Sequence, residues 1–329
     1  MTIRLKQITL RGKKLKLPAF FHDATYGHII ALDSNDIKKC GTDGVVVNTY
    51  HLFKHNLIEK MERIGIHKYM DLNLPIISDS GGFQVFSLIH KTGNGSIDDK
   101  KATFFIDDKK IELTPEKAIE IQLKIGADII MCLDDCRHAD DKQMLASVKR
   151  TIDWARRCKK EYLRLTREIK GGKKPLLFGI IQGGEDKKLR KYCAEKLIEI
   201  GFDGYAFGGW PMKDGKLLKE ILKYTASLMP DDKIKYAMGV GKPNDIIKCW
   251  NLGYNLFDCV IPTRDARHKR LFFWRGKKII EVNVRKKNFK IKEVRRLYEL
   301  WKKDSNEARR QATMHNLRVY SELMKKLRR

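Results

Sequence analysis

The sequence predicts a protein of the α/β fold class, with eight parallel strands closed into a barrel and a helix after each strand. Short apolar runs alternate with longer, helix-like segments from about residue 19 to residue 260. The runs are almost continuously apolar, which is typical of parallel strands that are covered on both faces. Eight strand-helix units in about 260 residues match the size of a (β/α)8 TIM barrel. An open doubly wound sheet is the alternative, but no Gly-x-Gly-x-x-Gly sequence stands at a strand-helix junction.

The first half of the chain opens with an N-terminal hairpin and then alternates strands with helices. The hairpin is expected over 8–17, and strands are expected at 19–20, 44–48, 76–77 and 128–133. The polar segment 91–110 predicts a second hairpin, because it contains Gly-Asn-Gly and Asp-Asp turns. A helix is expected to begin at Thr114-Pro115 and to end at Gly126, since these residues suit its N-cap, first-turn and C-cap positions.

The second half repeats the alternation more regularly until Val260. Strands are expected at 176–181, 204–207, 235–238 and 256–260, and helices at 142–169, 186–200, 217–228 and 244–252. A short hairpin at about 270–282 and two basic helices, at 292–303 and 306–326, are expected to follow. We therefore expect a single domain over residues 1–329, with the barrel at about 15–265 and a basic, Cys-free C-terminal helical extension at about 266–329.

Acids and glycines that follow the apolar runs predict a polar rim on the barrel. Because the carboxyl ends of parallel strands meet at one edge, side chains at these ends converge on one site. A carboxylate beside a Gly-Gly turn, as in Asp79-Ser80-Gly81-Gly82, is a common way to place a catalytic acid or base. Ends of this kind occur at 78–84, 133–136, 181–184, 207–209, 238–241 and 257–259. Taken singly, Asp79 and Asp258 could instead be helix N-caps.

The formal net charge of +27 is concentrated near the C-terminus. Residues 264–329 hold 23 Lys or Arg against 7 Asp or Glu. Such a field attracts polyanions, so a nucleic-acid partner is expected, although a merely solvated basic surface would have the same composition. The sequence has no apolar run long enough to span a membrane, no secretory signal and seven scattered cysteines. These features favour free thiols in a reducing compartment and predict a cytoplasmic protein.

Four blocks of the sequence together resemble the tRNA-guanine transglycosylase family, whose members are also called queuine tRNA-ribosyltransferases. The blocks are Asn48-Thr49-Tyr50-His51-Leu52, Asp79-Ser80-Gly81-Gly82-Phe83-Gln84-Val85-Phe86-Ser87-Leu88, Gly239-Val240-Gly241-Lys242-Pro243 and Phe257-Asp258-Cys259-Val260-Ile261-Pro262-Thr263-Arg264. The resemblance covers roughly residues 15–270 and, weakly, the last fifteen residues. It implies a TIM barrel that replaces guanine at the wobble position of GUN anticodons in tRNA with a 7-deazaguanine, through a covalent enzyme-ribose intermediate. It implies tRNA, guanine and the 7-deazaguanine base as partners, and it leaves a homodimer open.

The resemblance also implies catalytic roles for two carboxylates. Asp258 matches the nucleophile that attacks ribose C1′, and Asp79 matches the general acid/base. The chemistry agrees, because a carboxylate near C1′ can trap an oxocarbenium-like centre and guanine leaves poorly as an anion. No nucleotide cofactor is needed, since one glycosidic bond replaces another.

Further roles concern binding. Positions implied to hydrogen-bond the purine are Asp134, Gln182 and Gly209, and those implied to hold its faces are Phe83 and Met238. A carboxylate at 134 can accept two N–H bonds and so selects guanine-like bases. Arg264 and Arg267 follow the eighth strand and are expected to contact phosphates or the anticodon, although both could merely be solvated.

The chain departs from the family pattern in three places. Most family members bind zinc through three cysteines and a His near the C-terminus, but here no cysteine follows Cys259 and His315 is the only remaining ligand position. We therefore expect no zinc. Trp210-Pro211-Met212 stands where a small or aliphatic residue is common, which leaves preQ1, queuine and preQ0 open as the inserted base. Phe21-His22-Asp23-Ala24 replaces a more usual apolar-Pro-Val-Gly stretch.

Three other functions compete with base exchange in tRNA. A non-catalytic RNA-binding partner subunit has no physical need for Asp79, Asp134 and Asp258 together. A base exchanger that acts on DNA stays open, because the basic extension attracts either polymer. A glycoside hydrolase would also use two carboxylates on a barrel, but it does not explain the basic extension.

Overall fold

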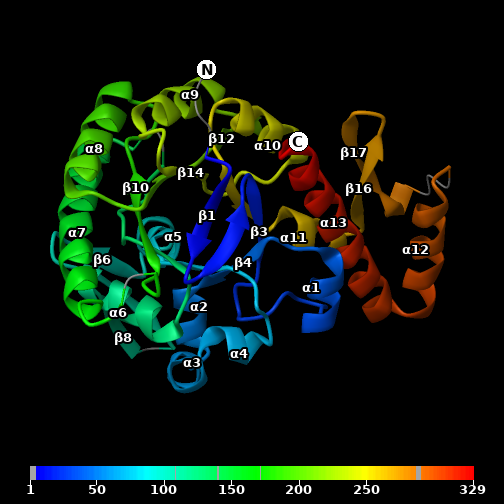
Figure 1. Cartoon of the computed structure of the whole chain (residues 1–329), viewed down its shortest axis with the longest axis horizontal. Coiled ribbons are helices and arrows are strands. Elements are labelled where there is room, and N and C mark those ends of the chain that lie inside the picture. Colours follow the sequence, from blue (N-terminus) through cyan, green and yellow to red (C-terminus); the bar gives the residue numbers. More distant parts are fainter. Residues whose placement is uncertain (1–4, 108, 139–140, 171, 287–289) are drawn as a thin grey trace.

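Eight parallel strands close into a barrel, which confirms the predicted fold class (Figure 1). The computed structural model describes residues 5–107, 109–138, 141–170, 172–286 and 290–329. In order around the barrel, the strands are β3 (Ala19–Asp23), β4 (Gly44–Asn48), β5 (Ile76–Asp79), β9 (Ile129–Met131), β10 (Leu176–Ile181), β11 (Gly204–Phe207), β14 (Ile234–Ala237) and β15 (Leu256–Cys259), which pairs with β3. Each neighbouring pair is parallel, so all eight carboxyl ends open onto the same mouth.

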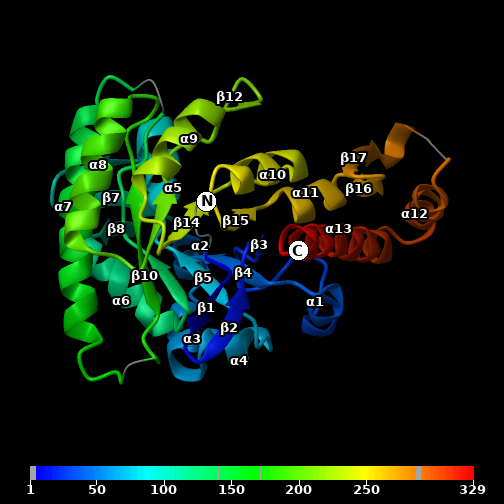
Figure 2. The same ribbon diagram turned by 45° about the horizontal axis from the view of Figure 1, so that its top comes forward.

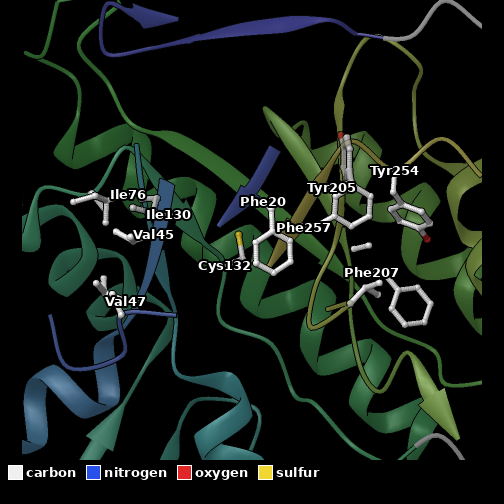
Figure 3. Packing of buried hydrophobic residues seen from close by; sticks show 14 of the residues in the cluster. Phe20, Val45, Val47, Ile76, Ile130, Cys132, Tyr205, Phe207, Tyr254 and Phe257 are labelled. Atoms are coloured by element: carbon white, nitrogen blue, oxygen red, sulfur yellow. The ribbon is translucent and has the colours of Figure 1, made fainter. Parts of the chain in front are cut away.

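The barrel wall separates two apolar cores because side chains alternate along each strand. One core packs between the strands and the surrounding helices, and Figure 3 shows part of it, with Phe20 and Phe257 together on the paired strands β3 and β15. The other core fills the barrel and includes Phe21, Ile77 and Tyr236. This alternation fixes which residues point toward the barrel axis at the mouth.

Helices surround the barrel and follow most of its strands (Figure 1). They are α1 (Ser34–Cys40), α2 (Thr49–Lys54), α3 (Ile58–Ile64), α4 (Ile66–Met70), α5 (Gly82–Val85), α6 (Pro115–Ile125), α7 (Met144–Leu165), α8 (Lys187–Ile200), α9 (Lys219–Leu228), α10 (Pro243–Asn251) and α11 (Ile261–Arg267). As predicted, Thr114 caps the start of α6 with its side chain, and Gly126 ends the helix in a left-handed conformation, with φ of 82°. A π-helix over Phe86–Lys91 continues α5.

Small antiparallel sheets lie outside the barrel sheet. The expected N-terminal hairpin is present as β1 (Gln7–Leu10) and β2 (Lys13–Lys16), and its leucines join the core inside the barrel. Where one hairpin was expected at 91–110, three strands form, namely β6 (Gly95–Ile97), β7 (Ala102–Ile106) and β8 (Lys109–Leu113). The expectation of a helix from 217 was wrong at its start, because β12 (Met212–Lys213) and β13 (Lys216–Leu217) form a short hairpin before α9.

The C-terminal extension consists of a hairpin and two helices. These are β16 (Arg270–Arg275), β17 (Lys278–Asn283), α12 (Lys292–Lys303) and α13 (Ser305–Leu327), with a short 3-10 turn at Val284–Lys286. Its own apolar cluster includes Leu271, Leu297 and Trp301. Figure 2 shows α12 at the outer edge and α13 returning to the barrel, beside α11. Within the described ranges, no helix combines the length and apolar character that a membrane span requires.

Candidate active site

Alternation along the strands carries a set of side chains to the barrel mouth. Each lies two residues beyond an inward-facing apolar residue, so it points toward the barrel axis as well. The pairs are Phe21 and Asp23, Ile77 and Asp79, Ile180 and Gln182, Tyr236 and Met238, and Leu256 and Asp258. Residues from all eight strand ends, with the loops that follow, enclose an open pocket of about 660 Å³.

The structure places most of the sequence-predicted site residues on this pocket. Its lining includes Asp79, Asp134, Asp258, Gly209, Phe83, Met238 and Arg264. Two predicted residues do not line it. Gln182 is only 1% exposed and lies behind Asp134, and Arg267 lines a neighbouring groove.

Asp79 and Asp258 share the pocket and influence each other electrostatically. Burial is the main cause that raises the pKa of Asp79 to about 6, and the negative charge of Asp258 adds to the rise. Asn48 Nδ2 donates a hydrogen bond of 3.0 Å to Oδ2 of Asp79. A pKa about one unit below neutrality lets this carboxyl group exchange a proton readily, as a general acid/base requires.

Asp258 is held at the end of β15 by the neighbouring strand end. The backbone N–H of Gly239 donates to Oδ1 of Asp258 over 2.9 Å, and Gly239 has a φ of 71°, which favours glycine. Burial raises the pKa of Asp258, while hydrogen bonds from Gly239 and from the Tyr236 hydroxyl lower it. The carboxyl group is thus fixed in direction and open to the pocket, as a nucleophile must be.

Asp134 and Gln182 form a buried pair on the opposite wall. Gln182 Nε2 donates to Oδ2 of Asp134 over 2.6 Å, while Gln182 Oε1 is buried without a hydrogen-bond partner among the described residues. Burial raises the pKa of Asp134 to about 7, and the charge of Asp79 contributes to this rise. The pair therefore presents the carboxyl group of Asp134 to the pocket. A ligand with N–H donors would stabilise the ionised form of this group.

The adjacent Asp135 has a structural environment and faces away from the pocket. It accepts hydrogen bonds from Arg150 Nη1 at 2.6 Å and from Arg137 Nε at 3.3 Å, and it lies 3.2 Å from His90 Nε2. Hydrogen bonds from His90 and Arg150, together with the charges of both arginines, outweigh burial and lower the pKa of Asp135. Of the two neighbouring acids, only Asp134 is available to a ligand.

An aromatic wall closes one side of the pocket. Phe83 is 44% exposed, and its ring meets Trp210 edge-to-face at a centroid distance of 5.3 Å. The Trp210 ring stacks on His138 at 5.6 Å with an interplanar angle of 14°. Trp210 therefore borders the pocket, in the loop between β11 and the β12–β13 hairpin. A flat aromatic ligand would find apolar faces here, with Met238 also on the lining.

Basic side chains continue the site beyond the pocket. Arg264 lies on the pocket rim, whereas Arg267, on the same helix α11, lines a groove of about 920 Å³ between the barrel and the extension. Basic residues that also line this groove are His268, Lys269, Arg285, Arg309 and Arg310. Arg267 Nη1 is buried and has no hydrogen-bond partner in the described structure. Such a groove has the charge to receive phosphates.

Sequence reasoning missed three residues of the pocket lining. Asp23 and Thr25 follow β3, and the Thr25 hydroxyl donates a hydrogen bond to Asp23. Asn48 begins one of the four blocks that resemble the family, where no role was predicted for it, and it orients Asp79. The signal for Asp23 was present, because a carboxylate ends the first strand as others end later ones, but the departure from the family pattern hid it.

The described residues do not fit a structural zinc site. His315 Nε2 lies 2.7 Å from the carbonyl oxygen of Phe272, so this nitrogen donates its proton there, and the His315 ring packs on Phe273 at 4.6 Å. The described part of the chain holds no group of three or more His, Cys, Asp or Glu side chains that could bind a metal ion. A tetrahedral zinc site needs four ligands, and one engaged imidazole does not supply them.

The fold and the pocket together define an enzyme that breaks and remakes a glycosidic bond, with two carboxyl groups at the carboxyl end of a parallel barrel. The sequence model of the queuine tRNA-ribosyltransferase family matches residues 1–329. A queuine tRNA-ribosyltransferase of Caldanaerobacter subterraneus is 38% identical, over 95% of this chain and 86% of its own length. Proteins of the same name from Psychrobacter sp. and Mannheimia succiniciproducens are 35% and 37% identical, over 98% and 95% of this chain and 88% and 85% of their own lengths. The chain therefore belongs to the queuine tRNA-ribosyltransferase family.

The raised pKa of Asp134 predicts that guanine binds more tightly as the pH rises. Guanine offers N–H donors at its N1 and N2 positions, and both need the ionised carboxylate of Asp134 as acceptor. The pKa of Asp134 is about 7, so at lower pH this carboxyl group must lose its proton before guanine can bind. We expect the Kd for guanine to fall about tenfold between pH 6 and pH 8, as measured by isothermal titration calorimetry. Asp134→Asn should bind weakly with no such pH dependence. An equally steep pH dependence in Asp134→Asn would contradict this assignment.

Gly82 has to be glycine because of Asp134. A β-carbon at residue 82 would overlap Oδ1 of Asp134 and lie 3.0 Å from its carbonyl oxygen. We expect Gly82→Ala to displace the carboxylate and to raise the Kd for guanine by about tenfold to a hundredfold. The control is Gly12→Ala, in the turn between β1 and β2, which brings backbone strain but no contact within 4 Å. Unchanged guanine binding by Gly82→Ala would show that Asp134 does not read the base.

Proposed function

We propose that this protein is an active tRNA-guanine transglycosylase. It exchanges guanine at the wobble position of GUN anticodons for a 7-deazaguanine base of the preQ1 or queuine type. The observation that carries this proposal is the arrangement of Asp79 and Asp258 in one open pocket, with the Asp134–Gln182 pair across the barrel from Asp258. Membership of the family supports the same reaction.

Asp258 acts as the nucleophile in two successive displacements at C1′. Its carboxylate oxygen forms a bond to C1′ as the C1′–N9 bond breaks, and the electron pair of that bond leaves with guanine. Asp79 donates a proton to the departing base, and it then takes the N9 proton of the incoming base. The incoming nitrogen bonds to C1′ and releases the Asp258 carboxylate. Atoms and charges balance without any further reactant.

Asp134 gives the pocket its preference for guanine-like bases. Its carboxylate accepts the two N–H bonds of the pyrimidine edge, and Gln182 holds the carboxylate in place from behind with its 2.6 Å hydrogen bond. Adenine would bring an acceptor, N1, against this carboxylate, so it is rejected. Phe83 and Met238 cover the faces of the base, which lowers the cost of taking it out of the anticodon stack.

The basic groove receives the RNA backbone around the exchanged nucleotide. Arg264 at the pocket rim and Arg267 in the groove lie on one helix, so a phosphate chain can pass from pocket to groove. The excess of positive charge in residues 264–329 supports a polyanionic substrate. Seven free cysteines, six of them buried, fit action in a reducing cytoplasm. A homodimer stays a prediction of the resemblance.

We also propose that the extension folds without zinc. Apolar packing around Leu297, which is completely buried, supports this proposal, as does the hydrogen bond of His315 to a backbone carbonyl. An apolar cluster of this kind can supply the cohesion that a structural metal supplies elsewhere.

Loss of the nucleophile should stop base exchange. We expect Asp258→Asn to lower the incorporation of radiolabelled guanine into unmodified GUN tRNA by at least about a thousandfold. A protein–RNA adduct that survives a denaturing gel should form with the unchanged protein only. Asp232→Asn, at an exposed site outside the pocket, is the matched control and should keep full activity. Normal incorporation by Asp258→Asn would refute the proposed mechanism, and competition between 7-substituted deazaguanines identifies the inserted base.

Chelators should not destabilise the extension. We expect an unchanged Tm in EDTA, and less than stoichiometric zinc in the purified protein by atomic emission. Leu297→Ala should lower the free energy of unfolding by about 2–5 kcal/mol, because it opens a cavity in the apolar cluster. Stoichiometric zinc, or a fall in Tm that added zinc reverses, would contradict the proposal.

A further inference from the structure

We propose that Asp23, oriented by Thr25, accepts a hydrogen bond from the ribose 2′-hydroxyl of the exchanged nucleotide and so makes the site selective for RNA over DNA. The inference rests on the proposed function and deepens it, because composition and charge alone do not separate the two polymers. Three features support this contact: the position of Asp23 in the barrel, the direction of its side chain and the stereochemistry of displacement at C1′.

Asp23 lies beside the proposed nucleophile on the adjoining strand. β3 pairs with β15 in a register that sets Phe21 opposite Asp258. Because Phe21 points into the barrel, Asp23 points the same way, two residues nearer to the mouth. Both carboxylates line the same pocket, and the charge of Asp23 raises the pKa of Asp258.

This side of the pocket is where the sugar must lie. In the closed barrel, β9 and β10 lie opposite β15 and β3, four strands away around the ring. Asp134 and Gln182 follow β9 and β10 and are joined by a hydrogen bond, and in the proposed reaction Asp134 accepts the N–H donors of the base. A nucleotide whose base reaches across the barrel to Asp134 therefore has its sugar near Asp258 and Asp23.

The stereochemistry of the reaction brings the 2′-hydroxyl to the same side. In a nucleoside the base is on the β face of the sugar, so a nucleophile that displaces it approaches C1′ from the α face. The 2′-hydroxyl projects from this α face, on the carbon next to C1′. An acceptor beside Asp258 on the barrel rim is thus in position to meet this hydroxyl, which distinguishes RNA from DNA.

The carboxylate of Asp23 is directed by its surroundings and keeps an oxygen for a ligand. The Thr25 hydroxyl donates to Oδ1 of Asp23, and no described residue donates a hydrogen bond to Oδ2. The end of β3 is held against β4, because the Ala24 amide donates to the Val46 carbonyl oxygen over 2.8 Å. A site on a paired strand positions an acceptor more accurately than a free loop does.

Asp23 has a second possible role, as a partner for Arg267. The charge of Asp23 favours the protonated form of Arg267, and helix α11 packs on β3. In that role, Asp23 would orient an arginine that binds phosphate. Loss of Asp23 would then lower kcat/KM equally for RNA and DNA substrates. The two roles therefore predict different responses to removal of a single oxygen atom from the substrate.

The experiment compares two anticodon stem-loops that differ only in a 2′-hydroxyl or 2′-hydrogen at the exchanged guanosine. For the unchanged protein, we expect kcat/KM for labelled guanine incorporation to fall about tenfold to a hundredfold on the 2′-deoxy substrate, since a hydrogen bond to a charged group is lost. Asp23→Val should be equally slow on both substrates. Asp23→Asn, which keeps an acceptor oxygen, should discriminate to an intermediate degree.

Controls separate this contact from general damage. Asp232→Val changes an exposed acid outside the pocket and should keep the full discrimination of the unchanged protein. A 2′-deoxy substitution at the neighbouring nucleotide should have the same effect with and without Asp23. Thermal melting shows whether Asp23→Val is folded, and Asp23→Asn supplies a closer replacement if it is not.

Two results would overturn the inference. One is an undiminished 2′-deoxy penalty in Asp23→Val, and the other is the absence of such a penalty in the unchanged protein. The affinity of Asp258→Asn for both stem-loops, measured by fluorescence anisotropy with and without Asp23→Val, tests the contact without turnover. A preference for the 2′-hydroxyl that depends on Asp23 in this binding assay supports the inference, whether or not guanine is incorporated. Absence of guanine incorporation would refute the proposed function but not this contact.

Discussion

The burial of three carboxyl groups around one pocket is the constraint on which the rest of the site depends. Asp79, Asp134 and Asp258 all have raised pKa values, with burial as the main cause and repulsion from a neighbouring acid as a contribution in each case. Three full negative charges in a space of low dielectric would repel one another strongly, and this repulsion favours the protonated forms of Asp79 and Asp134. A base with N–H donors and a sugar with an electrophilic carbon relieve this repulsion. Binding and chemistry are therefore coupled through the same charges.

The partners of these carboxyl groups orient them without neutralising them. The hydrogen-bond donors include Asn48 for Asp79, Gln182 for Asp134, and the Gly239 amide and Tyr236 hydroxyl for Asp258. Each is uncharged, so the carboxyl group keeps its capacity to take or release a proton. Asp135 shows the contrast, because two arginines and a histidine surround it and its pKa is lowered. In the active pocket, positive charge stands at the rim, where Arg264 can meet phosphate instead.

The sequence was sufficient for the barrel and for most of the pocket, because both follow from alternation. Apolar runs predict the strands. A residue two positions after an inward-facing apolar residue also points inward, as Asp79 and Asp258 do. The β12–β13 hairpin was missed because its strands are two residues long and one merges into a helical pattern. Gln182 was expected to contact the base, but its side chain is buried behind Asp134. The order of the strands does not predict how deeply a side chain lies below the pocket surface. Asp23 also ends a strand, but its place beside Asp258 depends on the register of β3 and β15, which the sequence does not give.

The extension also contacts the loop that holds Asp258. The Tyr320 hydroxyl, on α13, donates to the Gly241 carbonyl oxygen over 2.6 Å, in the loop whose Gly239 amide holds Asp258. Gly241 packs so closely on Cys259 that a β-carbon would overlap that side chain. This loop therefore has little room to move. Rigid support of this kind fixes the nucleophile in direction before substrate arrives, which is the condition for efficient displacement. The extension thus contributes to the alignment of Asp258, beside the RNA contacts proposed for its basic residues.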